Sequence, residues 1–412
     1  MKVSACRICA STDLTQFLDL GAMPPADSFL SAEAVEQVEI SYPLKVAVCG
    51  NCGLVQLTFV VDPEILYCHD YPYEASITKL GRQHWQEFAR TVCEMCKLSS
   101  KDLVIDVGSN VGILLEMFRQ NGPRVLGIDP AANIVQIANS NGIPTWVGFF
   151  NLEIAQRIVS EHGQVSVMTG TNVFAHVDDL SAFMKAVDVV LKPDGILIIE
   201  APYLGELLRN VEYDTIYHEH LSYIAVRPLT FLFNRFGMEI FNVQRRDIHG
   251  GSFRVFVQRQ GTGPHPVSDV IDEMLAIEER EGLADINRLR QFADAVTKNR
   301  EEVQWLLHRL KREGKRIAAV SAPAKGMTLL NYCRLGPEIL DFATEKSKLK
   351  IGRYTPGMHI PIFGDDHLLK EQPDYALILA WNFAEEIMNN LREFSDKGGR
   401  FIVPIPYPRI IG

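Results

Sequence analysis

Four of the eight cysteines in this chain form two matched C-x-x-C pairs. Cys6 with Cys9, and Cys49 with Cys52, flank a segment that is rich in turn formers and short strand-like runs. Each pair can present two thiolates to one ion, and four thiolates around Zn²⁺ form a closed tetrahedral site. We therefore predict a structural zinc site at these four residues. Four unrelated buried cysteines are the alternative.

A loop with two glycines follows the first long apolar run and reads Ile105-Asp106-Val107-Gly108-Ser109-Asn110-Val111-Gly112. Glycine lets the backbone approach a ligand closely at the carboxyl edge of a parallel sheet. Dinucleotide-binding folds favour G-x-G-x-x-G, whereas this spacing resembles the D-x-G-x-x-x-G loop of class I methyltransferases. Asp106, Gly108, Asn110 and Gly112 are therefore predicted to bind a cofactor. Asp129 ends the next predicted strand and can accept both ribose hydroxyls; capping of the following helix is the alternative.

Two histidines and a carboxylate lie together in Tyr217-His218-Glu219-His220, after the fourth predicted strand. A metal site is disfavoured because no third ligand is evident in the sequence. We interpret the segment as the carrier of a general base, which a histidine supplies near neutral pH; a solvated loop is the alternative. Asn172 and His176 follow the third predicted strand, so we expect them at the cofactor and the substrate. Capping or packing is the alternative for His176.

These side chains need a sheet edge to bring them together, and the apolar pattern predicts one. Strand-length apolar runs alternate with helical segments at 103–105, 125–128, 165–168 and 195–199. This alternation is typical of a parallel sheet covered by helices on both faces, which is a doubly wound α/β domain. Residues 239–245 and 253–258 are predicted to add an antiparallel pair at the edge, joined by the Gly250-Gly251 turn.

The remaining segments predict two further units. A tyrosine-rich passage (Tyr67, Tyr71, Tyr73) leads into a helix that begins near residue 78, in which Cys93 and Cys96 are interpreted as buried cysteines. Residues 266–313 predict a long helix or a helix pair. A second α/β unit is predicted with strand-like runs at 316–320, 339–342, 375–381 and 401–403. The predicted domains are 1–75, 76–262 and 263–412.

Composition restricts the possible partners. The chain has 412 residues, of which 47% are hydrophobic and 22% charged, with a net charge of −10. A negative protein has no general attraction for nucleic acid or for anionic membranes, so neither is expected as a partner. The N-terminus lacks the apolar run of a secretion signal, and no run reaches the roughly 18 apolar residues of a membrane span. We therefore expect a cytoplasmic protein.

In combination, these motifs are more specific than any of them alone. The chain resembles, over essentially its whole length, the sugar C-methyltransferases of deoxysugar biosynthesis, the group that includes the tetronitrose 3-C-methyltransferase. The motifs that carry the resemblance are the two cysteine pairs, Tyr71 to Ser76, Asp106 to Gly112, Asn172 to His176, Tyr217 to Tyr223, Gly250 to Ser252, Ala324 to Gly326 and Gly352 to Gly357.

The resemblance implies a class I, Rossmann-like methyltransferase domain between a small zinc domain and a C-terminal α/β domain. It implies S-adenosylmethionine as cofactor and His220 as catalytic base, and it places Tyr71, His176, Tyr217 and Glu219 around that base. It also implies that Phe149 and Phe150 flank the adenine of the cofactor, with core packing as the alternative.

The resemblance further implies a nucleotide-linked keto-deoxysugar as substrate, an NDP-4-keto-6-deoxyhexose with dTDP or GDP as the first expectations. Methylation at the carbon next to the ketone is expected, with C-3 favoured over C-5. Lys325, which follows a predicted strand and begins a predicted helix, can receive a diphosphate. Lys346, Lys350 and Arg353 are further candidates for binding it, and solvated surface charges are the alternative.

Two other functions are the alternatives to this reaction. A nicotinamide-dependent sugar-nucleotide oxidoreductase predicts G-x-G-x-x-G and a Tyr-x-x-x-Lys pair, and the first glycine loop shows neither. A non-catalytic zinc-ribbon binding module with a degenerate α/β domain would leave the loop and the histidines without a task. Such a module should have no affinity for S-adenosylmethionine.

Overall fold

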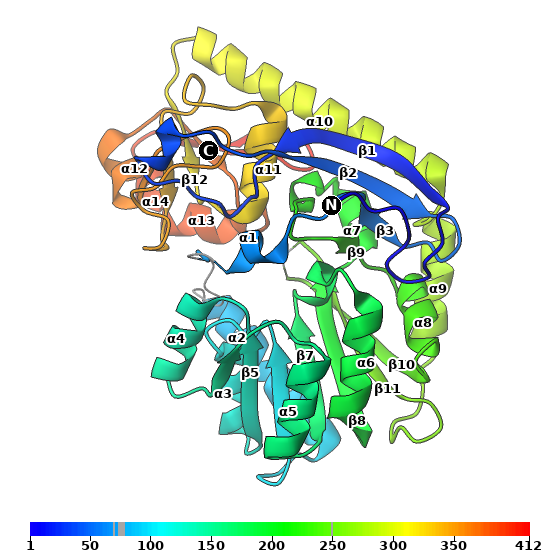
Figure 1. Ribbon diagram of the computed structural model, residues 1–412. Helices are drawn as coiled ribbons and strands as arrows, with labels where there is room; N and C mark the ends of the chain where they lie inside the picture. The colour runs from blue at the N-terminus through cyan, green and yellow to red at the C-terminus, as the bar shows by residue number, and fades with distance from the viewer. Residues whose placement is uncertain (69–70, 73–78, 249) are drawn as a thin grey trace.

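The computed structural model of the protein describes residues 1–68, 71–72, 79–248 and 250–412. These residues form three β-sheets. In Figure 1 the central sheet and its helices lie below, and the N-terminal and C-terminal sheets lie above it. Helix α10 (Ile286–Arg312) runs along the top of both upper sheets.

The central sheet has the strand order β10-β11-β8-β7-β4-β5-β6. Its strands are β4 (Leu103–Val107), β5 (Arg124–Asp129), β6 (Thr145–Val147), β7 (Val165–Thr171), β8 (Leu191–Pro202), β10 (Met238–Arg246) and β11 (Ser252–Arg259). The run from β8 to β6 is parallel, and β11 and β10 continue it in antiparallel pairing. The helices of this part are α2 (Lys79–Cys96), α3 (Ile113–Gln120), α4 (Ala132–Ser140), α5 (Leu152–His162), α6 (Leu180–Val190) and α8 (Val226–Asn234).

The N-terminal sheet is antiparallel and recruits a strand from far along the chain. It contains β1 (Leu14–Met23), β2 (Tyr42–Cys49), β3 (Val55–Leu57) and β9 (Ser222–Tyr223). Strand β9 pairs with β3 directly after the segment that carries the predicted base. Helix α1 (Pro63–Tyr67) and a 3₁₀ turn, Ala34–Glu36, complete this part.

The C-terminal sheet has the order β14-β13-β12-β15-β16-β17. Its strands are β12 (Ile317–Val320), β13 (Ala343–Glu345), β14 (Ile362–Gly364), β15 (Tyr375–Ile378), β16 (Arg400–Val403) and β17 (Arg409–Ile411). Its helices are α11 (Ala324–Cys333), α12 (Asp366–Glu371), α13 (Ala384–Asn390) and α14 (Arg392–Asp396). Helices α9 (Val270–Glu281) and α10 connect it to the rest of the chain.

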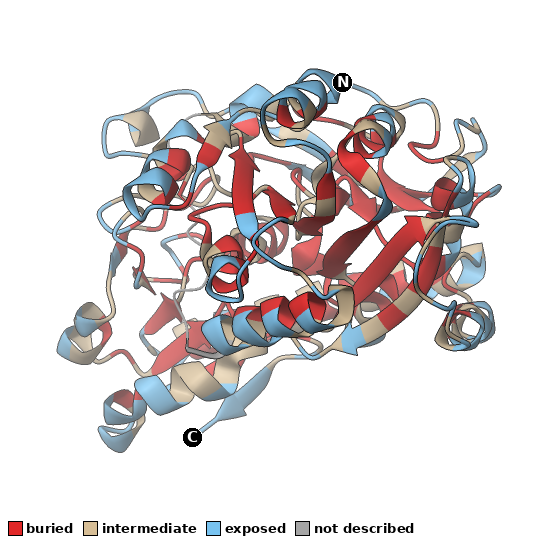
Figure 2. Cartoon of the chain, turned by 90° about the horizontal axis from the view of Figure 1, so that it is seen from below, coloured by how far each residue is buried: buried red, intermediate tan, exposed pale blue. Residues whose placement is uncertain are grey.

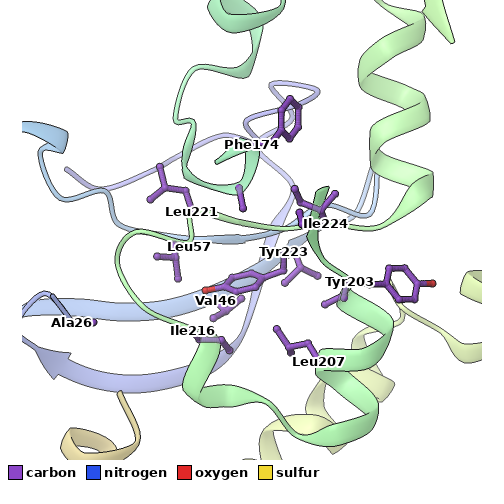
Figure 3. Packing of buried hydrophobic residues seen from close by; sticks show 14 of the residues in the cluster. Ala26, Val46, Leu57, Phe174, Tyr203, Leu207, Ile216, Leu221, Tyr223 and Ile224 are labelled. Carbon is purple, nitrogen blue, oxygen red and sulfur yellow. The ribbon is translucent and has the colours of Figure 1, made fainter. Parts of the chain in front are cut away.

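Buried apolar residues hold the three parts together. Figure 2 shows strands that are buried along most of their length inside helices whose outer faces are exposed. At the junction drawn in Figure 3, Leu57 of β3, Leu221 and Tyr223 pack near Ile216 and near Leu207 of helix α7 (Leu204–Asn210). Each fully buried Leu or Ile side chain contributes about 1.5–3 kcal/mol. The N-terminal sheet is thereby fixed to the loop that carries the histidines.

Most predicted elements are confirmed, and one is wrong. The doubly wound sheet, its antiparallel edge pair and the helix pair at 266–313 are all present. The run Ile339–Phe342 is not a strand: a turn ends at its start, Asp341 lies in a bend, and the strand β13 begins only at Ala343. Cys93 is buried in α2 as predicted, whereas Cys96, the last residue of that helix, is partly exposed.

None of the described helices is both long and apolar enough to cross a membrane.

Candidate active site

A cavity of about 650 Å³ lies where the parallel strands of the central sheet end. Its wall includes residues that directly follow β4, β5 and β7, together with Pro202 at the end of β8. Carboxyl ends of parallel strands are where doubly wound sheets bind cofactors. Residues of α1, of the segment 215–220 and of the C-terminal part complete the wall. All three parts of the chain therefore contribute to one cavity.

The glycine loop has the backbone conformations that its sequence predicts. Gly108 has φ +64°, and a Cβ atom there would lie 2.2 Å from Val173, so only glycine fits. Asn110 also has a left-handed conformation, with φ +50°, and both residues line the cavity. Gly112 is not among the lining residues; it has φ +82° and packs against Ile143 at the start of α3. The role of Gly112 is therefore explained by packing.

Two buried carboxylates line the cavity at the ends of β4 and β5. Burial raises the pKa of Asp106 to about 7, although the Thr169 hydroxyl lies 2.6 Å from its Oδ1. Burial also raises the pKa of Asp129, which accepts hydrogen bonds from the backbone N–H groups of Asn110 and Ala131, both at 2.9 Å. Asp129 thus supports the turn before α4. Each of its oxygens keeps a second lone pair for a ligand hydroxyl.

The predicted aromatic pair and Asn172 also line the cavity. Phe149 is 40% exposed, so its ring is available to a ligand. Phe150 packs against Phe183 with ring centroids 5.4 Å apart, so core packing accounts for at least part of its role. Asn172 has φ +57°, and its backbone N–H donates to the carbonyl of Glu200 at 2.7 Å. A non-glycine residue held in this conformation is a common feature of binding sites.

His220 is held by a backbone carbonyl. Its Nδ1 lies 2.7 Å from the carbonyl oxygen of Thr215. A carbonyl can only accept, so Nδ1 carries the proton and the lone pair of the neutral ring is on Nε2. The ring centroids of Tyr217 and His220 lie 4.0 Å apart, and those of His176 and His220 lie 5.0 Å apart. The structure therefore brings these three predicted residues together.

His218 belongs to a different environment. It does not line the cavity, and its Nε2 lies 3.2 Å from the carbonyl of Tyr42 in the N-terminal sheet. The two histidines of the H-x-H segment therefore do not share a ligand. Among the described residues, the four N-terminal cysteines are the cluster with the geometry to hold a metal ion.

A buried group of two acids and one lysine lies beside the histidines. Tyr71 donates to Glu219 Oε2 at 3.1 Å. Burial and the nearby Asp27 raise the pKa of Glu219 well above its ordinary value. Burial also raises the pKa of Asp27, against the opposing effect of Lys350, whose Nζ lies 3.6 Å away. Asp27, Glu219 and Lys350 all line the cavity.

The four predicted substrate-binding cations divide into two groups. Lys325 and Lys350 line the cavity, whereas Lys346 is exposed outside it and Arg353 donates to the carbonyl of Phe29 at 3.4 Å. Lys350 is buried and donates to the carbonyl of Ala322 at 2.8 Å.

Lys325 lies at the start of α11, beside groups that partly neutralise its charge. Its Nζ lies 4.4 Å from the Trp381 ring and contacts the side-chain oxygen of Asn382. Burial lowers the pKa of Lys325, and the nearby Asp214 and Glu212 oppose that shift.

The four cysteines of the zinc motif converge. Their sulfur atoms all lie within 4.8 Å of one another, with 3.5 Å between Cys6 and Cys52 and between Cys9 and Cys49. Tetrahedral coordination at a Zn–S distance of about 2.3 Å places sulfurs about 3.8 Å apart, so this set fits zinc. None of the four lines the cavity, and four thiolates leave no open position on the metal. The site therefore serves the structure of the N-terminal part.

Comparisons with known proteins assign the family. Three family models match: a zinc binding domain at residues 6–67, a methyltransferase domain at 82–243 and a C-methyltransferase C-terminal domain at 247–406. The C-methyltransferase NovU of Streptomyces niveus is 39% identical over 409 residues, which cover 99% of this chain and 97% of that protein. The chain belongs to the C-methyltransferase family.

More distant similarities cover less than half of this C-methyltransferase. The ubiquinone biosynthesis O-methyltransferase of Erwinia tasmaniensis is 28% identical over 170 residues, which cover 32% of this chain and 68% of that protein. The solved magnesium protoporphyrin IX methyltransferase of Synechocystis is 16% identical, with a TM-score of 0.36, and the match covers 46% of this chain and 90% of that one.

The C-methyltransferase uses S-adenosylmethionine, and its own residues fit that cofactor. The cavity offers two buried carboxylates, Asp106 and Asp129, to a molecule that carries positive charge and ribose hydroxyls. The left-handed loop at Gly108 and Asn110 leaves room for close approach of a ligand to the backbone. The family resemblance, the class I fold, the cofactor and the zinc-binding domain inferred from sequence are confirmed.

Sequence reasoning missed two cavity residues that come from the N-terminal part. Tyr67 ends α1, and its hydroxyl lies 3.2 Å from His176 Nδ1. Asp27 follows a pair of prolines and faces Lys350. The only sequence signal for Tyr67 is its place in the tyrosine-rich passage, and Asp27 has none. Tyr73 to Ser76, which belong to the family motifs, lie outside the described residues.

Proposed function

We propose that this enzyme transfers the methyl group of S-adenosylmethionine to the carbon next to the ketone of an NDP-4-keto-6-deoxyhexose. C-3 is the first candidate for that carbon and C-5 the second, and dTDP and GDP are the first candidates for the nucleotide. The similarity to NovU over the full chain supports C-methylation. The observation that carries the proposal is His220, whose Nδ1 contact with the Thr215 carbonyl makes Nε2 the basic atom in the same cavity as the cofactor loop.

The chemistry explains why a histidine base is needed. A saturated sugar carbon is not nucleophilic, but a carbon next to a ketone becomes so when it loses a proton. His220 Nε2 accepts that proton, and the electron pair of the C–H bond moves towards the carbonyl oxygen. A hydrogen-bond donor in the cavity then stabilises the enolate oxygen, with Tyr71, Tyr217 and His176 as the candidates. S-adenosylmethionine, when bound, supplies the electrophilic methyl group.

The C-terminal part is proposed to hold the nucleotide diphosphate. Lys325 supports this because it combines a positive charge with a position at the N-terminus of the ten-residue helix α11, where N–H groups are available to an anion. Lys350 is proposed as a second contact from the same wall. Lys346 and Arg353 stay predictions from sequence, as do the three domain ranges.

Mass spectrometry tests the reaction. Wild-type enzyme is incubated with S-adenosylmethionine and dTDP- or GDP-linked 4-keto-6-deoxyhexoses, and deuterium exchange into the sugar is followed without the methyl donor. We expect one added CH₂ and exchange at the carbon that is methylated. A change of two hydrogens that depends on a nicotinamide cofactor, without methylation, would instead establish the oxidoreductase.

A pair of histidine variants tests the base. His220→Ala should abolish both exchange and methylation while it retains cofactor binding, measured by calorimetry. The matched control is His218→Asn, which changes the other histidine of the segment, outside the cavity, and should retain turnover. Wild-type turnover by the His220 variant would remove the assignment of the base.

A further inference from the structure

Tyr67 is a cavity residue for which the proposed reaction has no role so far. It is the last residue of α1, which begins with Pro63 after Asp62, whose side chain accepts the backbone N–H of Glu64 as a helix cap. Leu66, next to Tyr67, is buried and anchors the helix. Burial raises the pKa of the Tyr67 phenol well above its ordinary value. The residue is thus a neutral hydroxyl held in a fixed place on the cavity wall.

Tyr67 contacts one of the two cavity histidines. Its hydroxyl lies 3.2 Å from His176 Nδ1, and the two rings are stacked, with centroids 6.0 Å apart and an angle of 12° between planes. The His220 ring also lies beside the His176 ring, with centroids 5.0 Å apart. Burial, with a smaller effect of His220, lowers the pKa of His176 well below its ordinary value. His176 is therefore a neutral imidazole with a single N–H.

The position of that N–H decides what His176 can do. Its Nε2 is buried and has no hydrogen-bond partner among the described residues, although the residue lines the cavity. If the phenol donates to Nδ1, Nε2 carries the proton and can donate to a ligand oxygen. If Nδ1 donates to the phenol, Nε2 is a second buried base beside His220. Only the first arrangement pairs a base with a donor, which is what enolate formation needs.

We propose that Tyr67 is a positioning residue that holds His176 as its Nε2–H tautomer, so that His176 donates a hydrogen bond to the enolate oxygen. The inference rests on the proposed function and deepens it, because it selects one donor from the three candidates. The carbon-bound proton goes to His220 Nε2 and gives an imidazolium, and the electron pair goes to the carbonyl oxygen. His176 keeps its own proton and stays neutral beside the new cation, which avoids two adjacent positive charges.

Nitrogen NMR reads the tautomer directly. Enzyme labelled with ¹⁵N in the histidine rings is recorded between pH 6 and 9, and the His176 signals are assigned by their loss in His176→Asn. We expect Nε2 to carry the proton throughout this range in the wild type. In Tyr67→Phe the preference for Nε2–H should weaken, which shows as ¹⁵N shifts averaged between the two tautomers. An Nδ1–H tautomer in the wild type overturns the inference.

Kinetics tests the consequence. Tyr67→Phe should lower kcat by roughly 10- to 100-fold, up to the lower range for loss of an oxyanion donor, and should slow solvent exchange at the methylated carbon similarly. KM for the sugar nucleotide should change less than about threefold, because the effect is on the transition state. The matched control is Tyr223→Phe, which removes a buried hydroxyl without a partner among the described residues, away from the cavity. We expect wild-type kcat for this control.

Two outcomes separate this inference from the proposed function. Wild-type kcat in a folded Tyr67→Phe enzyme overturns the role of Tyr67, whether or not the substrate is a keto-sugar. The proposed function is overturned instead if the wild-type enzyme shows the Nε2–H tautomer of His176 but methylates no keto-sugar. In that case the NMR of Tyr67→Phe alone decides whether Tyr67 controls the tautomer.

Discussion

Asp106 shows how one buried residue links ligand binding to pH. Its pKa is raised to about 7 by burial, so the carboxyl is largely neutral at pH 6 and largely ionised at pH 8. In the unfolded chain it ionises near the ordinary carboxyl pKa. The folded state therefore holds an extra proton between these two values, and this residue lowers stability as pH rises through that window. A ligand with positive charge favours the ionised form.

The first prediction concerns cofactor affinity. Between pH 6 and 8 the ionised fraction of a group with a pKa of about 7 rises about tenfold, so affinity for S-adenosylmethionine should rise by up to about tenfold. Calorimetry measures this, and Asp106→Asn should bind more weakly with a flat pH profile. Glu212, whose pKa burial also raises to about 7, lies outside the cavity, so Glu212→Gln should keep the wild-type profile. An unchanged slope in Asp106→Asn would show that another group is responsible.

The second prediction concerns the pair of Lys350 and Asp27. Their side chains are 6% and 5% exposed, so removal of one partner leaves a buried group uncompensated. Lys350→Met should lower the free energy of unfolding by about 3–5 kcal/mol. The double variant Asp27→Asn with Lys350→Met should recover at least half of that loss, as measured by denaturant unfolding. Additive losses in the double variant would mean that the two residues are not coupled.

Among single residues, those within local motifs could be predicted from sequence and those that act across the fold could not. Asp106, Gly108, Asn110 and His220 belong to motifs and line the cavity. Lys346 and Arg353 were predicted from charge and family resemblance, but nothing local in the sequence reports that they lie off the cavity. Tyr67 and Asp27 reach the cavity because tertiary packing brings the N-terminal part there.

Among elements, hydropathy predicts those with long buried runs. Residues 103–105 of β4 and 196–199 of β8 are continuous apolar runs because helices or packed chain cover both faces. Strands β14 and β17 have three residues each, too few for any period to show. The strand prediction for Ile339–Phe342 is wrong for a related reason. Ile339 and Leu340 are buried at the end of a turn, and a short apolar run has the same pattern in a turn and in a strand.

The zinc motif acts on the cavity through the elements next to it. Arg7, between the cysteines of the first pair, donates to the carbonyl of Leu57 at 2.9 Å and to Asp178 at 3.1 Å. Asp178 lines the cavity. Leu57 also donates its backbone N–H to the carbonyl of Leu221, next to the segment that carries the predicted base. Zinc held by the four cysteines would therefore stabilise a sheet to which the predicted base is attached.

The third prediction follows for metal removal. Cys6→Ser and Cys49→Ser should lose zinc and several kcal/mol of stability, because metal binding to such a module is coupled to its folding. Turnover should fall as the sheet loosens, and cofactor affinity should fall less, since the glycine loop lies on the central sheet. Elemental analysis and thermal unfolding measure these effects. Cys93→Ala, in α2, should retain full zinc, and full zinc in both serine variants would contradict the four-thiolate site.

For the whole molecule, the important feature is that three parts of the chain line one cavity. The glycine-loop wall comes from the central sheet, and the C-terminal wall comes from Glu345 of β13 and from residues that follow β12, β13 and β15. The net charge of −10 repels anionic nucleotides at long range, so the proposed binding of a sugar nucleotide depends on local cations such as Lys325. Neither this shared cavity nor its division between a central-sheet wall and a C-terminal wall is visible in any single motif.

The last prediction uses this division. S-adenosylhomocysteine should slow backbone hydrogen exchange in the segments 106–112 and 129–131, whereas dTDP or GDP should slow it in 323–325 and 345–350. Each ligand at 100 times its Kd should add about 2.7 kcal/mol to the free energy of unfolding. Mass spectrometry of exchanged peptides maps both effects. The exposed strand β17, far along the C-terminal sheet, serves as the internal control and should not respond. A ligand protects the backbone that it contacts. If S-adenosylhomocysteine protects 106–112 and 129–131 but neither nucleotide protects 323–325 and 345–350, the cofactor assignment stands and the nucleotide must bind elsewhere.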